Sequence, residues 1–203
     1  VLSHARRTSL GMANFLSRAE EDGHLCMRDL NELREYCYTV AGIVGELLTT
    51  LFLKDAPELA RERPVLRAHA AAFGEALQLV NVLKDEREDA SAGRRFLPPS
   101  LSRESVIALA RRDLARARLY GDALVRGNAP GGMIAFTALP VELAEATLVR
   151  IEQDGPGAKV SRADVLAMLQ RHELTAHSEP ATPREPIAES SVGSCRNLSG
   201  TSD

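Results

Sequence analysis

Apolar residues recur three and four positions apart along most of the first 171 residues. This spacing places them on one face of a helix, and the alternating, β-branched runs that favour strands are missing. The pattern therefore predicts an all-α fold. The expected helices cover residues 3–20, 29–53, 57–90, 102–126, 133–153 and 161–171.

Local signals mark the ends of these helices. Asp29 is suited to an N-cap position, and Glu32 three residues later resembles the partner in a capping box. The segment GNAPGG at 127–132 separates two helices. Pro64 and Pro140 lie inside expected helices, so we expect a kink or a restart at each of them.

The composition changes at residue 172. Residues 172–203 are rich in Ser, Thr, Pro and Glu and contain few apolar residues. Burial cannot offset the entropy that such a segment would lose on ordering. We predict a helical domain over 1–171 and a disordered polar tail over 172–203.

Composition restricts the classes of partner. The chain has 203 residues, 44% of them hydrophobic, which is enough for one core. Its 28 acidic and 25 basic residues give a net charge of -3, so no nucleic-acid partner is expected and any anion must be held by local chemistry. Cys26, Cys37 and Cys195 have neither disulfide-framework nor metal-ligand spacing, which favours a cytoplasmic location. No stretch reaches the roughly 18 uncharged apolar residues of a membrane span.

The helix expected over 57–90 carries a polar stripe. At about 100° per residue, Gln78, Asn81, Asp85 and Asp89 fall within roughly 80° of arc. Gly74 lies on the same arc, one turn earlier, and would leave room beside the stripe. These polar side chains therefore point into the same space.

The two aspartates of this stripe predict a cation site. Asp85 and Asp89 lie one turn apart and repel each other unless a cation lies between them. Carboxylate and amide oxygens suit Mg²⁺, which commonly uses one or two carboxylates and fills its other positions with water and phosphate. Nearby, Lys84 and Arg94 supply cationic groups for phosphate oxygens, and Gly93 allows a tight turn. The alternative is that this run of mixed charge is only a solvated helix end.

Residues 34–52, within the helix expected over 29–53, have an apolar side. Tyr36, Val40 and Val44 fall within roughly 80° of arc and form an apolar wall with one phenol at its end.

Small residues occupy another side of the same helix. Ala41, Gly42 and Gly45 cluster there with Tyr38, which would either leave a slot or allow close helix packing.

These segments together resemble the squalene/phytoene synthase family. QLVNVLKDEREDASAGRRFLP at 78–98 resembles the family's second aspartate-rich segment, and YCYTVAGIVG at 36–45 resembles its Tyr-Cys-x-x-Val-Ala-Gly-x-Val-Gly segment. RRTSLGMANFL at 6–16 also fits. The resemblance is strong over residues 5–101 and weaker from there to 171.

The resemblance implies an isoprenoid synthase helical bundle around a central apolar cavity, apparently incomplete at its N-terminus. It implies a prenyltransferase that condenses two farnesyl or geranylgeranyl diphosphates head to head, through a cyclopropyl diphosphate, to a squalene- or phytoene-type product. Mg²⁺ is the implied cofactor, with NADPH in addition if squalene is the product. The oligomeric state stays open, and peripheral membrane contact is compatible with so apolar a product. The implied roles are metal binding for Asp85 and Asp89, catalysis for Tyr36, Lys84 and Arg94, and substrate binding for Val40, Ala41, Val44, Gly45, Gln78 and Asn81.

One element of the family pattern is not found. Its first aspartate-rich segment should lie some tens of residues before 6–16, where the 203 residues leave no room. The sequence is then either the C-terminal portion of a longer enzyme or an inactive relative that acts as a binding or assembly partner in isoprenoid biosynthesis. A third reading is another reaction on a prenyl diphosphate, such as hydrolysis or cyclisation.

Overall fold

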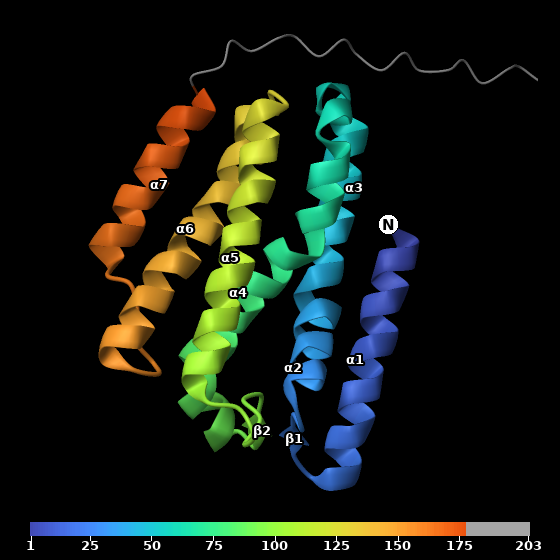
Figure 1. Ribbon diagram of the computed structural model, residues 1–203, viewed down its shortest axis with the longest axis vertical. Coiled ribbons are helices and arrows are strands. Elements are labelled where there is room, and N and C mark those ends of the chain that lie inside the picture. Colours follow the sequence, from blue (N-terminus) through green and yellow to red (C-terminus); the bar gives the residue numbers. More distant parts are fainter. Residues whose placement is uncertain (178–203) are drawn as a thin grey trace, which may run out of the picture.

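The computed structural model describes residues 1–177, with the side chains of residues 20–22 and 173–177 left aside, and confirms the all-α prediction. Its helices run side by side, with α1 at one edge of the bundle and α7 at the other (Figure 1). The helices are α1 (Leu2–Asp22), α2 (Leu30–Cys37), a π-helical segment η1 (Tyr38–Gly42), α3 (Ile43–Asp55), a 3-10 turn η2 (Pro57–Arg61), α4 (Arg63–Ser91), α5 (Arg103–Arg126), α6 (Gly131–Asp154) and α7 (Arg162–His177). Two short parallel strands, β1 (Leu25–Cys26) and β2 (Arg94–Arg95), accompany them.

The helix ends follow their local signals with two differences. Asp29 caps α2, because its Oδ1 accepts a hydrogen bond from the Glu32 N–H at 3.0 Å. Glu32 does not complete a capping box, since its carboxylate accepts from the Arg28 N–H at 2.6 Å instead. The last helix was expected to end at 171 but continues to His177. The rest of the predicted disordered tail, residues 178–203, lies outside the described residues.

The two internal prolines behave differently. Pro64 lies in the first turn of α4, directly after the η2 turn, so the expected restart occurs there. Of the two outcomes expected at Pro140, a kink or a restart, the restart does not occur, because α6 continues through that residue from Gly131 to Asp154. Packing of α6 against α5, α4 and α7 outweighs the loss of one hydrogen bond within the helix.

Helices α3 and α4 approach each other backbone to backbone. A Cβ atom added to Gly45 would overlap the carbonyl oxygen of Ala70, and one added to Gly74 would overlap that of Ala41. The small residues therefore serve close helix packing, which was one of the two readings of the sequence. The space expected beside Gly74 is filled by the backbone of the neighbouring helix.

The core lies mainly between α4 and α5. Leu66, Leu79 and Leu83 of α4 are fully or almost fully buried, as is Leu124 of α5. The ring of Phe73 stacks on that of Tyr120, with centroids 5.2 Å apart. This packing fixes which face of α4 is left to meet other elements.

Two helical segments have the length and apolar composition of a membrane span, Leu30–Asp55 and Gly131–Asp154. Neither segment contains 18 uncharged residues in a row, because Glu46 interrupts the first and Glu142 the second, so the two segments reach this character only when charged residues are tolerated within them. Core helices of globular domains meet the same criterion, and Leu33, Cys37 and Ile43 of the first segment are buried in the bundle.

The α3–α4 contact generates the first prediction. Gly45→Ala should lower the free energy of unfolding by about 3 kcal/mol, because the new methyl group must push two backbones apart. Gly121→Ala is the matched control, since no atom lies within 4 Å of the added Cβ in α5. It should leave stability unchanged or raise it by up to about 1 kcal/mol. Urea unfolding curves measure both; equal midpoints for the two variants would contradict the prediction.

Candidate functional site

One cleft gathers most of the polar side chains that the sequence identified. It has a volume of about 480 Å³ and lies between α1, the start of the α2–α3 helix, α4 and β2. Its lining residues are Met12, Leu16, Leu25, Tyr36, Gln78, Asn81, Val82, Lys84, Asp85, Asp89, Arg94 and Phe96. The predicted polar stripe of α4 is thus one wall of a single site.

The charged residues of this wall form neutral pairs. Lys84 Nζ donates to Asn81 Oδ1 at 3.2 Å and lies 3.4 Å from Asp85 Oδ2. Arg94 holds Asp89 through two nitrogens, with Nε and Nη2 at 3.0 and 2.9 Å from the same carboxylate oxygen. Each aspartate therefore has a cationic neighbour that could also bind a phosphate oxygen.

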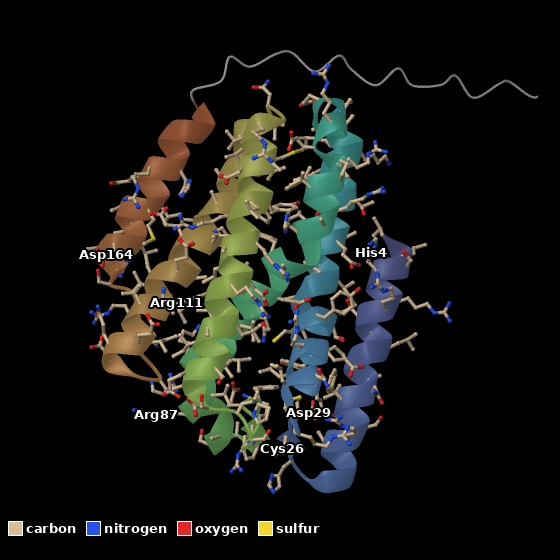
Figure 2. The ribbon with its side chains drawn as sticks, in the orientation of Figure 1. His4, Cys26, Asp29, Arg87, Arg111 and Asp164 are labelled. Atoms are coloured by element: carbon tan, nitrogen blue, oxygen red, sulfur yellow. The ribbon has the colours of Figure 1, made fainter. Side chains whose placement is uncertain are left out.

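Arg94 owes its position to the β1–β2 pair. The Leu25 N–H donates to the Gly93 carbonyl at 3.2 Å, and the Met27 N–H donates to the Arg95 carbonyl at 2.9 Å. Gly93 has φ of 73°, the left-handed region that glycine occupies without strain, so the predicted tight turn is present. Figure 2 shows the labelled residues Cys26, Asp29 and Arg87 at this same end of the bundle, where α4 finishes. A loop far away in sequence thus holds the guanidinium at the end of the stripe.

Tyr36 lies in the same cleft and is enclosed by aromatic rings. Only 9% of the residue is exposed. Its ring stacks on Phe96, with centroids 4.5 Å apart, and meets Phe15 edge to face at 5.5 Å. Burial raises the pKa of the Tyr36 hydroxyl, so the phenol stays neutral. An electron-rich neutral ring therefore borders a site that also holds paired charges.

The predicted apolar wall is only partly in this cleft. Tyr36 lines it, whereas Val40 and Val44 do not. The three residues lie in three successive segments, Tyr36 in α2, Val40 in the π-helical η1 and Val44 in α3. Val40 packs at the edge of the core, but Val44 is 50% exposed. The apolar wall therefore begins at Tyr36 in the cleft and ends at Val44, which the described residues do not cover.

Two residues predicted to bind substrate take part in helix packing. The Ala41 carbonyl of η1 lies against Gly74 of α4, and Gly45 of α3 lies against the Ala70 carbonyl. No ligand fits between the backbones at these two contacts. The close-packing reading is therefore confirmed, and substrate binding by Ala41 and Gly45 stays a prediction.

Sequence reasoning missed the side of the cleft that faces the aspartates. Met12 and Leu16 of α1 and Leu25 of β1 form it, together with Phe96. Phe96 could have been found, because it directly follows the two arginines. Nothing local distinguishes Met12 or Leu16 from other apolar helix positions, so only the packing of α1 reveals them.

The donor set fits a hard cation of the Mg²⁺ type. Asp85 and Asp89 offer carboxylate oxygens to the same cleft, with the amides of Gln78 and Asn81 beside them. Across residues 1–177, no group of three or more His, Cys, Asp or Glu side chains is arranged to hold a metal ion. Two carboxylates with water and phosphate in the other positions is a common Mg²⁺ arrangement. The residues therefore fit the ion when a phosphate ligand accompanies it.

Comparisons with known proteins point in one direction. A family model described as squalene/phytoene synthase matches residues 2–118. Squalene synthase of Schizosaccharomyces pombe is 34% identical over 91 residues, which are 43% of this chain and 19% of that protein. Squalene synthase ERG9 of Gibberella zeae is 37% identical over 101 residues, 47% of this chain and 20% of that one. Chloroplastic phytoene synthase of Narcissus pseudonarcissus is 44% identical over 71 residues, 35% of this chain and 16% of that one.

Solved structures agree on the fold. The structure of TcSQS in complex with the ligand BPH1237 superposes with a TM-score of 0.62 and 21% sequence identity, covering 90% of this chain and 62% of that chain. The match to the curated relatives named above spans at most 20% of their length.

The three tyrosines of the chain, of which Tyr36 lines the cleft, generate a prediction about pH. Burial is the main cause that raises the pKa of all three tyrosines, Tyr36, Tyr38 and Tyr120, above the ordinary value of about 10. Their contribution to stability is therefore complete below about pH 10 and is lost as the pH rises through the folded-state pKa values. Tyrosinate absorbance should appear at higher pH in the native chain than in urea, and the free energy of unfolding should fall over the same range. Equal titration curves in both states would contradict this.

Proposed function

The chain belongs to the squalene/phytoene synthase family, and from this premise we propose that its cleft is one wall of a prenyl diphosphate site. The proposed activity is that of a transferase, the Mg²⁺-dependent head-to-head condensation of two farnesyl or geranylgeranyl diphosphates through a cyclopropyl diphosphate. A squalene-type product would also require NADPH as hydride donor, whereas a phytoene-type product would not. We place the protein in the cytoplasm, with peripheral membrane contact suited to its apolar product.

One observation carries the proposal. Two carboxylates, two cations, two amides and a buried tyrosine converge on one cleft that is apolar on its other side. A diphosphate needs cationic groups around its oxygens, while a prenyl tail needs apolar surface. The cleft offers both within one volume of about 480 Å³.

Each residue has a task in this reaction that follows from its position. Lys84 and Arg94 bind phosphate oxygens as the bond from the allylic carbon to the diphosphate oxygen breaks and both electrons leave with the diphosphate. Asp85 and Asp89 would hold Mg²⁺, which supplies further stabilisation of that negative charge.

The apolar side protects the carbocation that remains. The Tyr36 ring borders the cleft and can face the positive charge. Met12 and Leu16 offer apolar surface on the other side. A prenyl tail bound against them would displace water, which would otherwise quench the cation.

Ligand binding requires an exchange of partners at the polar wall. Arg94 is paired with Asp89, and Lys84 with Asp85. A metal-bound diphosphate would take up both the cations and the carboxylates, so each charge exchanges one partner for another. The four charges of the wall sum to zero before binding. A bound Mg²⁺ ion would offset two of the three negative charges of an ionised prenyl diphosphate, so most of the ligand charge is compensated inside the partly enclosed cleft.

A second candidate is a binding or assembly partner without turnover. The supporting observation is that, within residues 1–177, the cleft carries one pair of carboxylates and faces apolar side chains opposite them. Such a site would bind a prenyl diphosphate with Mg²⁺ and hold it without ionising it.

The test is Mg²⁺-dependent release of inorganic diphosphate from farnesyl diphosphate by the purified chain. Asp85→Asn should reduce the release at least about 100-fold, because a neutral amide oxygen binds Mg²⁺ far more weakly than a carboxylate does. Glu88→Gln is the matched control, since this exposed residue of the same helix does not line the cleft. Unchanged release in Asp85→Asn would overturn the metal assignment.

A binding measurement separates the two candidates. Mg²⁺-dependent binding of farnesyl thiodiphosphate without any release from farnesyl diphosphate would favour the binding partner. Binding together with release would favour the enzyme.

A further inference from the structure

Helix α1 supplies the apolar side of the cleft from the edge of the bundle. It carries Met12 and Leu16, which face the cleft. In Figure 1 it stands at the margin, beside α2 and α3, and within the described chain it packs mainly on η1, α3 and β1. Its position therefore decides the distance between the apolar side and the aspartates of α4.

One face of α1 lies against the π-helical segment. Gly11 allows close approach, since an added Cβ would overlap the side-chain methyl of Thr39. Four residues later, Phe15 is 2% exposed and meets the ring of Tyr36. Arg7 lies four residues before Gly11, on the same face of the helix.

Toward the C-terminal end of α1, Arg18 pairs with the buried Glu32 of α2. A second directional contact holds the N-terminal end.

Arg7 makes that contact in a closed set of three hydrogen bonds. Its Nη1 donates to Glu46 Oε2 at 2.8 Å, and its Nη2 donates to the Tyr38 hydroxyl. The Tyr38 hydroxyl in turn donates to Glu46 Oε1 at 2.9 Å. The Arg7 guanidinium also lies over the Tyr38 ring, 5.6 Å from its centroid. Each of the three side chains is thus held by the other two.

The set bridges the π-helical segment. Tyr38 is the first residue of η1, and Glu46 lies in the first turn of α3, beyond its end. Tyr36 precedes Tyr38 by two residues and lines the cleft. Arg7 therefore ties α1 to both ends of η1, the segment that directly follows the end of α2 where Tyr36 lies.

The exposure of these groups indicates positioning rather than stability as their main effect. The side chains of Arg7 and Glu46 are 45% and 30% exposed. Ion pairs at this exposure contribute little to the free energy of folding, whereas their fixed geometry restricts where two helices lie.

We propose that Arg7, Tyr38 and Glu46 are positioning residues that hold α1 so that Met12 and Leu16 form the wall for the prenyl tail. The proposal rests on the prenyl diphosphate site inferred above. The proposal predicts different effects on the prenyl tail and on the diphosphate. The three residues act on the apolar side and make no contact with the groups that bind diphosphate.

Tyr38→Phe is the sharpest test, since it removes the hydroxyl and keeps the ring. With Mg²⁺ present, the affinity for farnesyl thiodiphosphate should fall about tenfold, while that for inorganic diphosphate stays within about twofold. Amide hydrogen exchange in the first half of α1 should become about tenfold faster. Glu46→Gln keeps one acceptor oxygen and replaces the other with an NH₂ donor, so its effect should fall between those of Tyr38→Phe and the unsubstituted chain. Arg150→Ala, which removes an exposed pair with Asp154 on α6, should change none of these quantities.

The outcomes distinguish this proposal from the proposed function. Unchanged exchange in α1, or an equal loss of affinity for both ligands, would overturn the positioning role. If the unsubstituted chain binds neither ligand, the proposed prenyl diphosphate site is overturned. The positioning role of Arg7, Tyr38 and Glu46 is then overturned as well. Faster exchange with selective loss of the prenyl ligand would support both.

Discussion

Helices α3 and α4 touch backbone to backbone, and the arrangement of the site depends on that contact. Gly45 meets the Ala70 carbonyl and Gly74 meets the Ala41 carbonyl, with no side chain between them. Two helices so close cannot rotate about their axes without a clash, so their facing directions are fixed. As a result Tyr36 at one end of the α2–α3 helix and Gln78 on α4 open into the same cleft.

The charges of the cleft are arranged for exchange of partners. An isolated pair of carboxylates one turn apart would be repulsive, but Lys84 and Arg94 neutralise Asp85 and Asp89 individually. Arg94 is brought there by the backbone pairing of β1 with β2, and this pairing joins segments 69 residues apart in the register Leu25 with Arg94. The small strand pair is thus a functional part of a helical protein, because it places a guanidinium beyond the end of a helix.

The apolar half of the site lies on elements at the periphery of the bundle. It depends on α1, an edge helix, and on the π-helical turn between α2 and α3. Phe15 of α1 meets Tyr36 of α2 edge to face, and Tyr36 stacks on Phe96, so the three rings form one aromatic cluster. In Figure 2 the labelled His4 marks the opposite end of α1 from Cys26, so the contacts of Arg7 act near one end of this helix and β1 near the other. A polar wall on a core helix therefore faces an apolar wall on a peripheral one.

Local patterns in the sequence were enough to locate the helices along the chain and to predict which side chains share a helix face. Periodicity placed Gln78, Asn81, Asp85 and Asp89 on one stripe, and Asp29 and Gly93 marked a cap and a turn, because each of these depends on neighbours within a few residues. Tertiary structure alone decided what each face meets. Ala41 and Gly45 went to helix packing instead of a slot, and α6 continued through Pro140, since in each case distant backbone and side chains set the space available. The Met12 and Leu16 side of the cleft and the β1–β2 pairing have the same origin, as contacts between distant segments leave no local pattern to read.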